Sequence, residues 1–414
     1  MYLTQQQQLK RLSKIEYKAL KELMFYSKNI YNVALYNIRQ EFFNSKKYLN
    51  KNENQKLCQV NKNWSLLQAG IAQQIVKKID ENFKSFFALL KAKKKGVLSS
   101  DTKIRIPHYK EKDELFQLIL RDVPDIKKGY FKLPLSKKFK KNNPNFKLKI
   151  KIPKNIIGKE IKQIRINPKQ KGLYFEVEYI YKGEENVKTD LNENNIVGID
   201  LGLNNLATIV ANTGSSMIID GKKIKSINQY YNKSKAKLYS KLNKNKQTES
   251  RKTKYLNRKR NNRIKDYLTK SARQIINFTI KNKAKTLVLG YNKEWKNEIN
   301  IGKKNNQNFV NIPFLMLKNK LEYLCEINNI ELIITEESYT SKCSFFDNED
   351  MKKQDKYLGT RIKRGLFKTS KNYVFNADIN GALNIIRKVK PENQLLIDLR
   401  NKGFMANPKR IIVI

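Results

Sequence analysis

Apolar side chains recur every three or four residues in the first hundred residues of the chain, from about residue 12 to 95. The clearest run shares one helical face and comprises Ile71, Ile75, Ile79, Phe83, Phe86, Phe87 and Leu90. Apolar stripes at this spacing are typical of packed helices. The region therefore predicts a helical bundle, and any function is expected on its opposite, Lys-rich faces.

The pattern changes to short alternating segments between residues 102 and 182. KLKIKIP at 147–153 and YFEVEY at 174–179 alternate polar and apolar side chains, and prolines separate such segments. Alternation with a period of two is typical of half-buried strands. We predict a small β domain here, which together with the helices forms one region over 1–185. A polar linker over 186–195 follows it.

The second half of the chain alternates predicted strands with predicted helices. An apolar strand at 195–202 ends in an acid and a glycine, and 205–210 is its expected hairpin partner. Two long basic helices are predicted from 222, and residues 268–280 carry an apolar helical face. The strand 286–289, the helix 313–326 and the strand 330–335 then predict βαβ units and a parallel sheet.

Charge narrows the class of partner. The 86 Lys and Arg residues exceed the 37 Asp and Glu residues by 49 charges. Twelve lysines and no acid lie between Asp125 and Glu160, and seventeen basic residues with one acid lie from 222 to 265. A chain this basic is expected to bind nucleic acid phosphates. The candidate nucleic-acid-binding residues are Lys138, Lys141, Lys149, Lys151, Arg251, Arg258, Lys259, Arg260 and Arg263.

Two other interpretations of the charge stay open. A charged face can simply be solvated, and a structural RNA-binding protein would be equally basic. A membrane-surface protein fits less well, because such proteins use one basic helix or a short polybasic patch. No signal peptide or membrane span is expected. The three cysteines, Cys58, Cys325 and Cys343, lie far apart and suggest reduced thiols. An intracellular, nucleoid-associated location is therefore expected, with no membrane partner.

Two acids are candidates for metal-dependent phosphodiester cleavage. That chemistry uses carboxylates from distant parts of a chain to hold two cations about 3.5–4 Å apart. Asp200 ends an apolar strand, but an acid in such a turn is common. Asp378 opens a predicted helix, where an N-cap role is the alternative. The small residues Ala377, Gly381 and Ala382 would let that helix pack closely against a sheet.

At this point a family resemblance becomes visible. GIDLGLNNLATI at 198–209 and NADINGALNIIRK at 376–388 resemble the first and third RuvC motifs of the TnpB family of transposon-encoded, RNA-guided DNA endonucleases. Similar stretches are IRIPHYK at 104–110, NKEWKNEINIGKKNNQNF at 292–309 and EESYTSKCSF at 336–345. The similarity covers nearly the whole chain.

The resemblance implies an α+β multidomain fold. Residues 1–185 would form a β-barrel wedge with an inserted helical recognition lobe that binds RNA and DNA. Residues 196–414 would form an RNase H-like RuvC nuclease domain, with a basic helical insert at about 222–283 and a degenerate zinc-ribbon insert at about 340–375. The implied partners are a guide RNA from the transposon end and double-stranded target DNA, and the implied cofactor is Mg²⁺ or Mn²⁺.

The first departure from the family concerns zinc. Its ribbon usually has two CxxC pairs, whereas here only Cys343 remains and Phe346 stands where its CxxC partner would be. A structural zinc site needs a full set of thiolate or imidazole ligands, so no zinc is expected. The loop should instead close on Phe345, Phe346, Tyr357, Leu366 and Phe367.

The second departure concerns the catalytic acids. The family's second motif ends its strand in Glu, but Gly290 stands here. Adjacent parallel strands lie about 4.8 Å apart, so an acid leaving the strand 330–335 could replace it. Some family relatives with a displaced glutamate carry it three residues before a Thr-Ser pair, here Thr340-Ser341. The resemblance therefore implies that Glu337 rather than Glu336 completes the catalytic and metal-binding set with Asp200 and Asp378. Glu294 and Glu298, in the loop beyond the first strand, are poorer candidates.

The resulting hypothesis is an RNA-guided, metal-dependent DNA endonuclease. If Glu336 and Glu337 are only solvated loop acids, the chain would be a nuclease-inactive, RNA-guided regulator. A non-catalytic DNA-binding accessory protein of the transposon is a further alternative. A DDE-type transposase fits less well, because the last acid is Asp378 rather than a late Glu.

Overall fold

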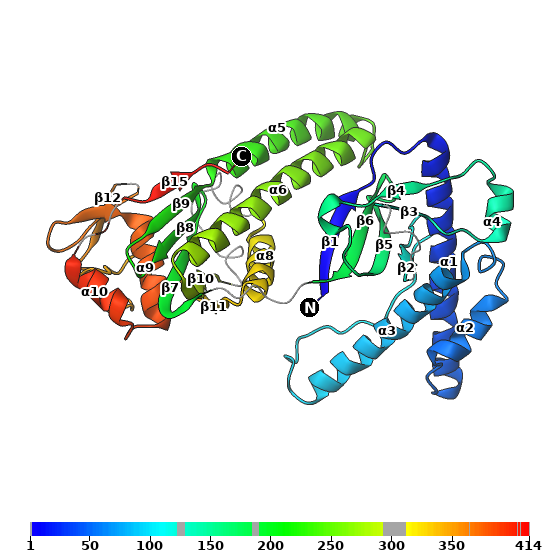
Figure 1. The fold of residues 1–414 in the computed structure, drawn as a ribbon, viewed down its shortest axis with the longest axis horizontal. Helices are drawn as coiled ribbons and strands as arrows, with labels where there is room; N and C mark the ends of the chain where they lie inside the picture. The colour runs from blue at the N-terminus through cyan, green and yellow to red at the C-terminus, as the bar shows by residue number, and fades with distance from the viewer. Residues whose placement is uncertain are drawn as a thin grey trace. The chain divides into compact units, whose positions relative to one another are not determined.

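The chain divides into two compact units, Met1–Glu185 and Asn186–Ile414, in the computed structural model (Figure 1). The structure describes residues 2–121, 129–183, 190–292, 312–363, 365–403, 405 and 407–413. Each unit has a hydrophobic core of its own. The poorer candidate acids Glu294 and Glu298 lie outside the described residues.

The helices of the first unit lie where the apolar spacing predicts them. They are α1 (Lys14–Ser45), α2 (Lys51–Gln59) and α3 (Ala69–Lys94). Ser13 and Glu16 cap the start of α1 reciprocally, each side chain accepting a hydrogen bond from the other residue's backbone N–H. The α3 stripe is buried from Ile71 to Phe83, while Leu90 near its end is exposed.

The strands of the first unit form a four-stranded antiparallel sheet and a separate ribbon. The sheet has the order β1 (Tyr2–Gln8), β6 (Tyr174–Lys182), β5 (Ile161–Lys169), β2 (Leu118–Leu120). The ribbon pairs β3 (Tyr130–Lys132) with β4 (Lys149–Lys151), and α4 (Lys137–Asn142) and a 3₁₀ turn at Lys154–Ile156 flank β4. Pairing among the described strands does not close a barrel.

The second unit is built on a six-stranded mixed sheet. Its order is β11 (Glu331–Thr335), β10 (Ala284–Gly290), β7 (Asn192–Leu201), β8 (Asn205–Ala211), β9 (Ser216–Asp220), β15 (Lys409–Ile411). The parallel pairing of β7, β10 and β11 and the β7–β8 hairpin are confirmed.

The linker expected over 186–195 is too long at its C-terminal end. Residues from Asn192 onward belong to β7, and the Asn192 N–H donates to the Lys283 carbonyl oxygen at 2.7 Å. Backbone pairing needs no apolar side chain, so a polar strand end leaves little trace in the hydrophobic pattern.

Helices cover both faces of this sheet. One face packs against α6 (Arg251–Lys281) and α8 (Phe314–Ile327), and α5 (Lys222–Lys244) pairs with α6. The other face packs against α9 (Ala377–Val389) and α10 (Gln394–Lys402). Val197 and Ile199 face α6, so strand alternation turns Gly198 and Asp200 toward α9.

The segment 340–375 closes on aromatic side chains. Its strands are β12 (Thr360–Lys363), β13 (Leu366–Lys368) and β14 (Val374–Asn376). Phe345 and Phe367 are buried as expected, whereas Tyr357 and Leu366 are only partly covered. Phe346, also predicted, packs edge-on against Tyr373 and Phe375. Tyr373 and Phe375 were not among the predicted residues.

Candidate catalytic site

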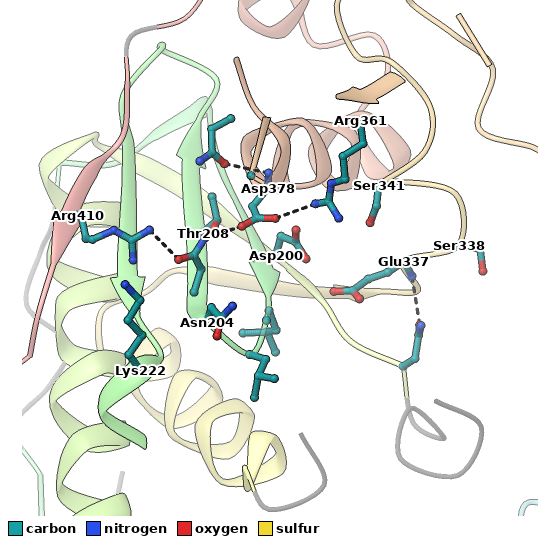
Figure 2. A pocket seen from close by; sticks show the side chains of 17 residues that line it. Asp200, Asn204, Thr208, Lys222, Glu337, Ser338, Ser341, Arg361, Asp378 and Arg410 are labelled. Carbon is teal, nitrogen blue, oxygen red and sulfur yellow. Dashed lines mark hydrogen bonds and ion pairs between the residues drawn. The ribbon is translucent and has the colours of Figure 1, made fainter. Parts of the chain in front are cut away.

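A cavity of about 600 Å³ opens at the C-terminal ends of β7 and β10 in the second unit. Asp200 of β7, Asp378 of α9 and Glu337 after β11 all line it (Figure 2). The three predicted acids therefore come together, although 178 residues of sequence separate Asp200 from Asp378.

Asp200 lies beneath the first turns of α9. A Cβ added to Gly381 would come within 2.6 Å of its Oδ2 atom, so only glycine lets the helix approach this closely. Gly198 has the same role two residues earlier in β7, where an added Cβ would meet the Ala382 carbonyl oxygen at 2.6 Å. Burial raises the pKa of Asp200, and the nearby Asp378 carboxylate raises it further.

Asp378 projects from the first turn of α9 and is not the N-cap. Asn376 caps the helix, its side chain accepting from the N–H groups of Asp378 and Ile379. The Asp378 carboxylate is thereby left for other partners: the Asn205 amide donates to its Oδ2 at 2.5 Å, and Arg361 Nη2 lies 3.3 Å from its Oδ1. The N-cap alternative for Asp378 is wrong, because Asn376 makes the capping hydrogen bonds.

Glu337 fills the space that a side chain at position 290 would take. Gly290 pairs with Thr335, the last residue of β11. A Cβ added to Gly290 would lie 2.3 Å from Glu337 Oε1 and 2.8 Å from its Cγ. That Oε1 is buried and has no hydrogen-bond partner in the described part of the chain. Burial and the neighbouring Asp200 raise the pKa of Glu337.

Glu336 points elsewhere. Its carboxylate forms an ion pair with Lys388 and accepts a hydrogen bond from the Ser338 N–H at 2.8 Å, and its side chain is half exposed. Successive residues point to opposite sides of an extended chain, so only Glu337 reaches the cavity. The geometry thus separates two glutamates that are adjacent in sequence.

Carboxylate oxygens are the ligands that Mg²⁺ and Mn²⁺ prefer, and a buried oxygen without a partner suits that chemistry. As the side chains stand, however, no three Asp, Glu, His or Cys residues among those described converge into an ion site. Asn205 and Arg361 engage the two carboxylate oxygens of Asp378. The three acids have the ligand type and the location that a divalent cation needs, provided that the ion pair between Asp378 and Arg361 opens.

Three polar residues around Asp378 were not anticipated. Arg410 of β15 donates to the Asn205 Oδ1 at 2.9 Å, so it orients the amide that holds Asp378 (Figure 2). Arg410 also donates to Asp220 Oδ2 at 3.0 Å. Asn205 lies inside the first motif quoted above and could have been found there. Arg361 and Arg410 carry no local signal, because only the fold brings them to the cavity.

The candidate nucleic-acid-binding residues occupy two regions. In the first unit, Lys149 and Lys151 are exposed while Ile150 and Ile152 are buried, which gives the single basic face that the alternation predicts. Lys138 and Lys141 are exposed on the neighbouring α4.

Among the described helices, none combines the length and apolar composition of a bilayer span.

In the second unit, the expected pair of basic helices is confirmed as α5 and α6. Arg251, Lys259 and Arg263 are exposed on α6, and Arg258 is partly exposed. Arg260 differs from them: its Nε donates to Asn228 of α5 at 2.9 Å and its guanidinium lies over the Tyr231 ring. This contact joins the two helices, and burial lowers the Arg260 pKa.

Comparison with known proteins agrees with this architecture. A family model described as a probable transposase matches residues 176–296, and one described as a Cas12f1-like TNB domain matches residues 314–385. No curated protein sequence matches the chain.

Among solved structures, the chain is similar to Cas12f1 in a complex with sgRNA and target DNA. The identity is 20%, the match covers 90% of this chain and 83% of that one, and the TM-score of 0.56 shows a shared fold. A weaker match is the mini RNA-guided endonuclease CRISPR-Cas phi3, with 11% identity, coverage of 99% and 94%, and a TM-score of 0.47.

The fold and the acidic cavity define a mixed α/β multidomain protein of the transposase and Cas12f type. Within that class, the matches of residues 176–296 to the probable-transposase model and of residues 314–385 to the Cas12f1-like TNB domain agree with the resemblance to the TnpB family.

Proposed function

We propose that this protein is an RNA-guided, metal-dependent DNA endonuclease whose catalytic acids are Asp200, Glu337 and Asp378. The observation that carries the proposal is the exchange at position 290. Glycine stands where the family resemblance expects Glu, and the Glu337 carboxylate fills the vacated space beside Asp200. A decayed site would not need a third acid in that place.

These three carboxylates would hold Mg²⁺ or Mn²⁺, which when bound would supply an activated water and neutralise charge at the scissile phosphate. Burial, and after it repulsion between neighbouring acids, raises the pKa of Asp200 and of Glu337, so these two acids favour protons when no cation is bound. Arg361 forms an ion pair with Asp378, and a cation held by Asp378 would have to replace Arg361 there. Asn205, itself held by Arg410, orients the same carboxylate.

The two units would divide the binding of nucleic acid. We assign the first unit to the wedge and recognition lobe, with its sheet as part of a barrel, and the second to a RuvC domain of the RNase H type. Exposed basic side chains on β4, α4 and α6 would neutralise the phosphates of the guide RNA and its heteroduplex. The similar Cas12f1 structure is a complex with sgRNA and target DNA, which supports these partners.

The first experiment tests the RNA. The protein is expressed together with its flanking locus, purified in high salt, and its bound RNA is sequenced end to end. A single defined species is expected. RNA-free protein, or random RNA that high salt removes, would instead indicate a DNA-binding accessory protein.

The second experiment tests the nuclease with matched variants. With guide RNA and Mg²⁺, wild type should cut a matched plasmid, whereas Asp200→Asn and Glu337→Gln should not. Glu336→Gln is the control. It also removes one negative charge, but from the neighbouring residue, whose side chain faces Lys388 instead of the cavity. Tight guided binding without cutting by wild type would favour the inactive regulator. Equal activity of Glu337→Gln and wild type would remove Glu337 from the site.

A further inference from the structure

A second cavity, of about 330 Å³, adjoins the acidic one. Ser338, Tyr339, Ser341 and Lys342 line it, and Ser338 and Ser341 also line the larger cavity. The two spaces therefore share a wall made by the turn that follows Glu337. If a chain-like ligand reacts in the first cavity, the group linked to its reacting group would lie beside the second cavity.

Tyr339 is an unusual residue for its place in that turn. Its φ is +64°, and the Thr340 N–H donates to the Glu337 carbonyl oxygen at 3.2 Å, which closes a tight turn across it. The left-handed conformation costs least for Gly or Asn. A large aromatic residue here is disfavoured for folding, so its presence asks for a separate reason.

Among the described residues, no polar or aromatic partner of the Tyr339 side chain supplies this reason. The residue is 36% exposed, and no hydrogen bond or ring contact of its side chain occurs among the described residues. The neighbouring side chains suit a nucleotide: Ser338, Ser341 and the exposed Lys342 line the same cavity, and the Lys342 ammonium lies 5.9 Å from the centre of the Tyr357 ring. Base stacking on aromatic rings tolerates any sequence.

We infer that Tyr339 stacks on a base of the DNA strand next to the scissile phosphate, while Ser338, Ser341 and Lys342 contact the adjoining phosphate. The inference rests on the proposed function and deepens it by assigning a nucleotide subsite. Tyr339 holds the substrate and does not enter the chemistry. Because Glu337 lies two residues away, the same turn sets both the acid and the position of the strand.

The test compares Tyr339→Phe, Tyr339→Asn and Tyr339→Gly in the full chain with guide RNA. The Phe variant keeps the ring, whereas Asn and Gly remove it and suit the backbone better. We expect Asn and Gly to raise the thermal midpoint and to raise KM for cleavage by at least about fivefold, the lower end of an aromatic–base stack. The Phe variant should keep the wild-type KM, and kcat should change little in all three.

A second readout needs no cleavage. Guide-matched DNAs that carry 2-aminopurine at successive positions of each strand are bound in Ca²⁺. Stacking on Tyr339 quenches the fluorescence at one such position in wild type and Tyr339→Phe but not in Tyr339→Gly. Equal quenching and equal KM in all variants would overturn the inference while leaving the nuclease intact. A fall in kcat with unchanged KM would also overturn it, because it would show that the ring only supports Glu337. If wild type binds and quenches but does not cut, the nuclease proposal fails and the subsite stands.

Discussion

The sharpest test of the acidic site is the replacement of Gly290 by Ala. The added Cβ would lie 2.3 Å from Glu337 Oε1 and 2.6 Å from Ile385 Cδ1. Carbon contacts are optimal at about 3.5 Å or more, so roughly 1.2 Å must be recovered by movement of Glu337. Its carboxylate is therefore displaced from its present position beside Asp200.

Two effects of Gly290→Ala follow, and their sizes differ. Overpacking of this kind costs about 1–3 kcal/mol, which lowers the thermal midpoint by several degrees in a unit of this size. A misplacement of about 1 Å in a catalytic group costs roughly a hundredfold in rate. We therefore expect a folded protein that binds guide RNA and DNA normally but cuts about a hundredfold more slowly.

The assay is single-turnover cleavage of a guide-matched duplex in Mg²⁺, with DNA binding measured in parallel. A double variant, Gly290→Glu with Glu337→Ala, returns the acid to the strand end and should cut faster than either single change. Glu336→Ala is the matched control and should cut like wild type. Cleavage by Gly290→Ala at the wild-type rate would refute the reasoning, as would a double variant no better than Glu337→Ala.

Two further predictions concern protons and zinc. The folded-state pKa of Asp200 is raised, so its contribution to stability is fully present below the ordinary carboxyl pKa of about 3.9 and is lost as pH rises toward the raised value. In EDTA, Asp200→Asn should therefore melt above wild type by a margin that grows with pH over that window; a margin independent of pH would show that Asp200 is not desolvated. Elemental analysis after gel filtration should find no stoichiometric zinc, because the buried Cys343 thiol approaches the Asp350 carbonyl oxygen at 3.2 Å and Phe346 packs among aromatic rings. One zinc per chain would show that the ribbon survives with other ligands.

Much of the molecule follows from local sequence. The helical stripe ending at Phe83, the alternation around Ile150 and the basic pair α5 and α6 all appear where side-chain periodicity predicts them. Periodicity works there because one face of each element is buried and the other is solvated. Periodicity does not predict the polar strand β1: YLTQQQQ has little apolar pattern, yet it pairs with β6 along its whole length.

The acidic site divides in the same way. Sequence by itself supplied Asp200 and Asp378, because each sits in a recognisable motif. The expected neighbourhood of two parallel strands limited the third acid to Glu336 or Glu337, and the family resemblance favoured Glu337. Only the tertiary structure decided that Glu337 enters the cavity, that Asn376 caps α9, and that Arg361 holds Asp378. Each of those facts depends on the space between elements that are remote in sequence. The sequence shows a glycine at position 290, but only the packing shows that the Glu337 side chain fills the space beside it.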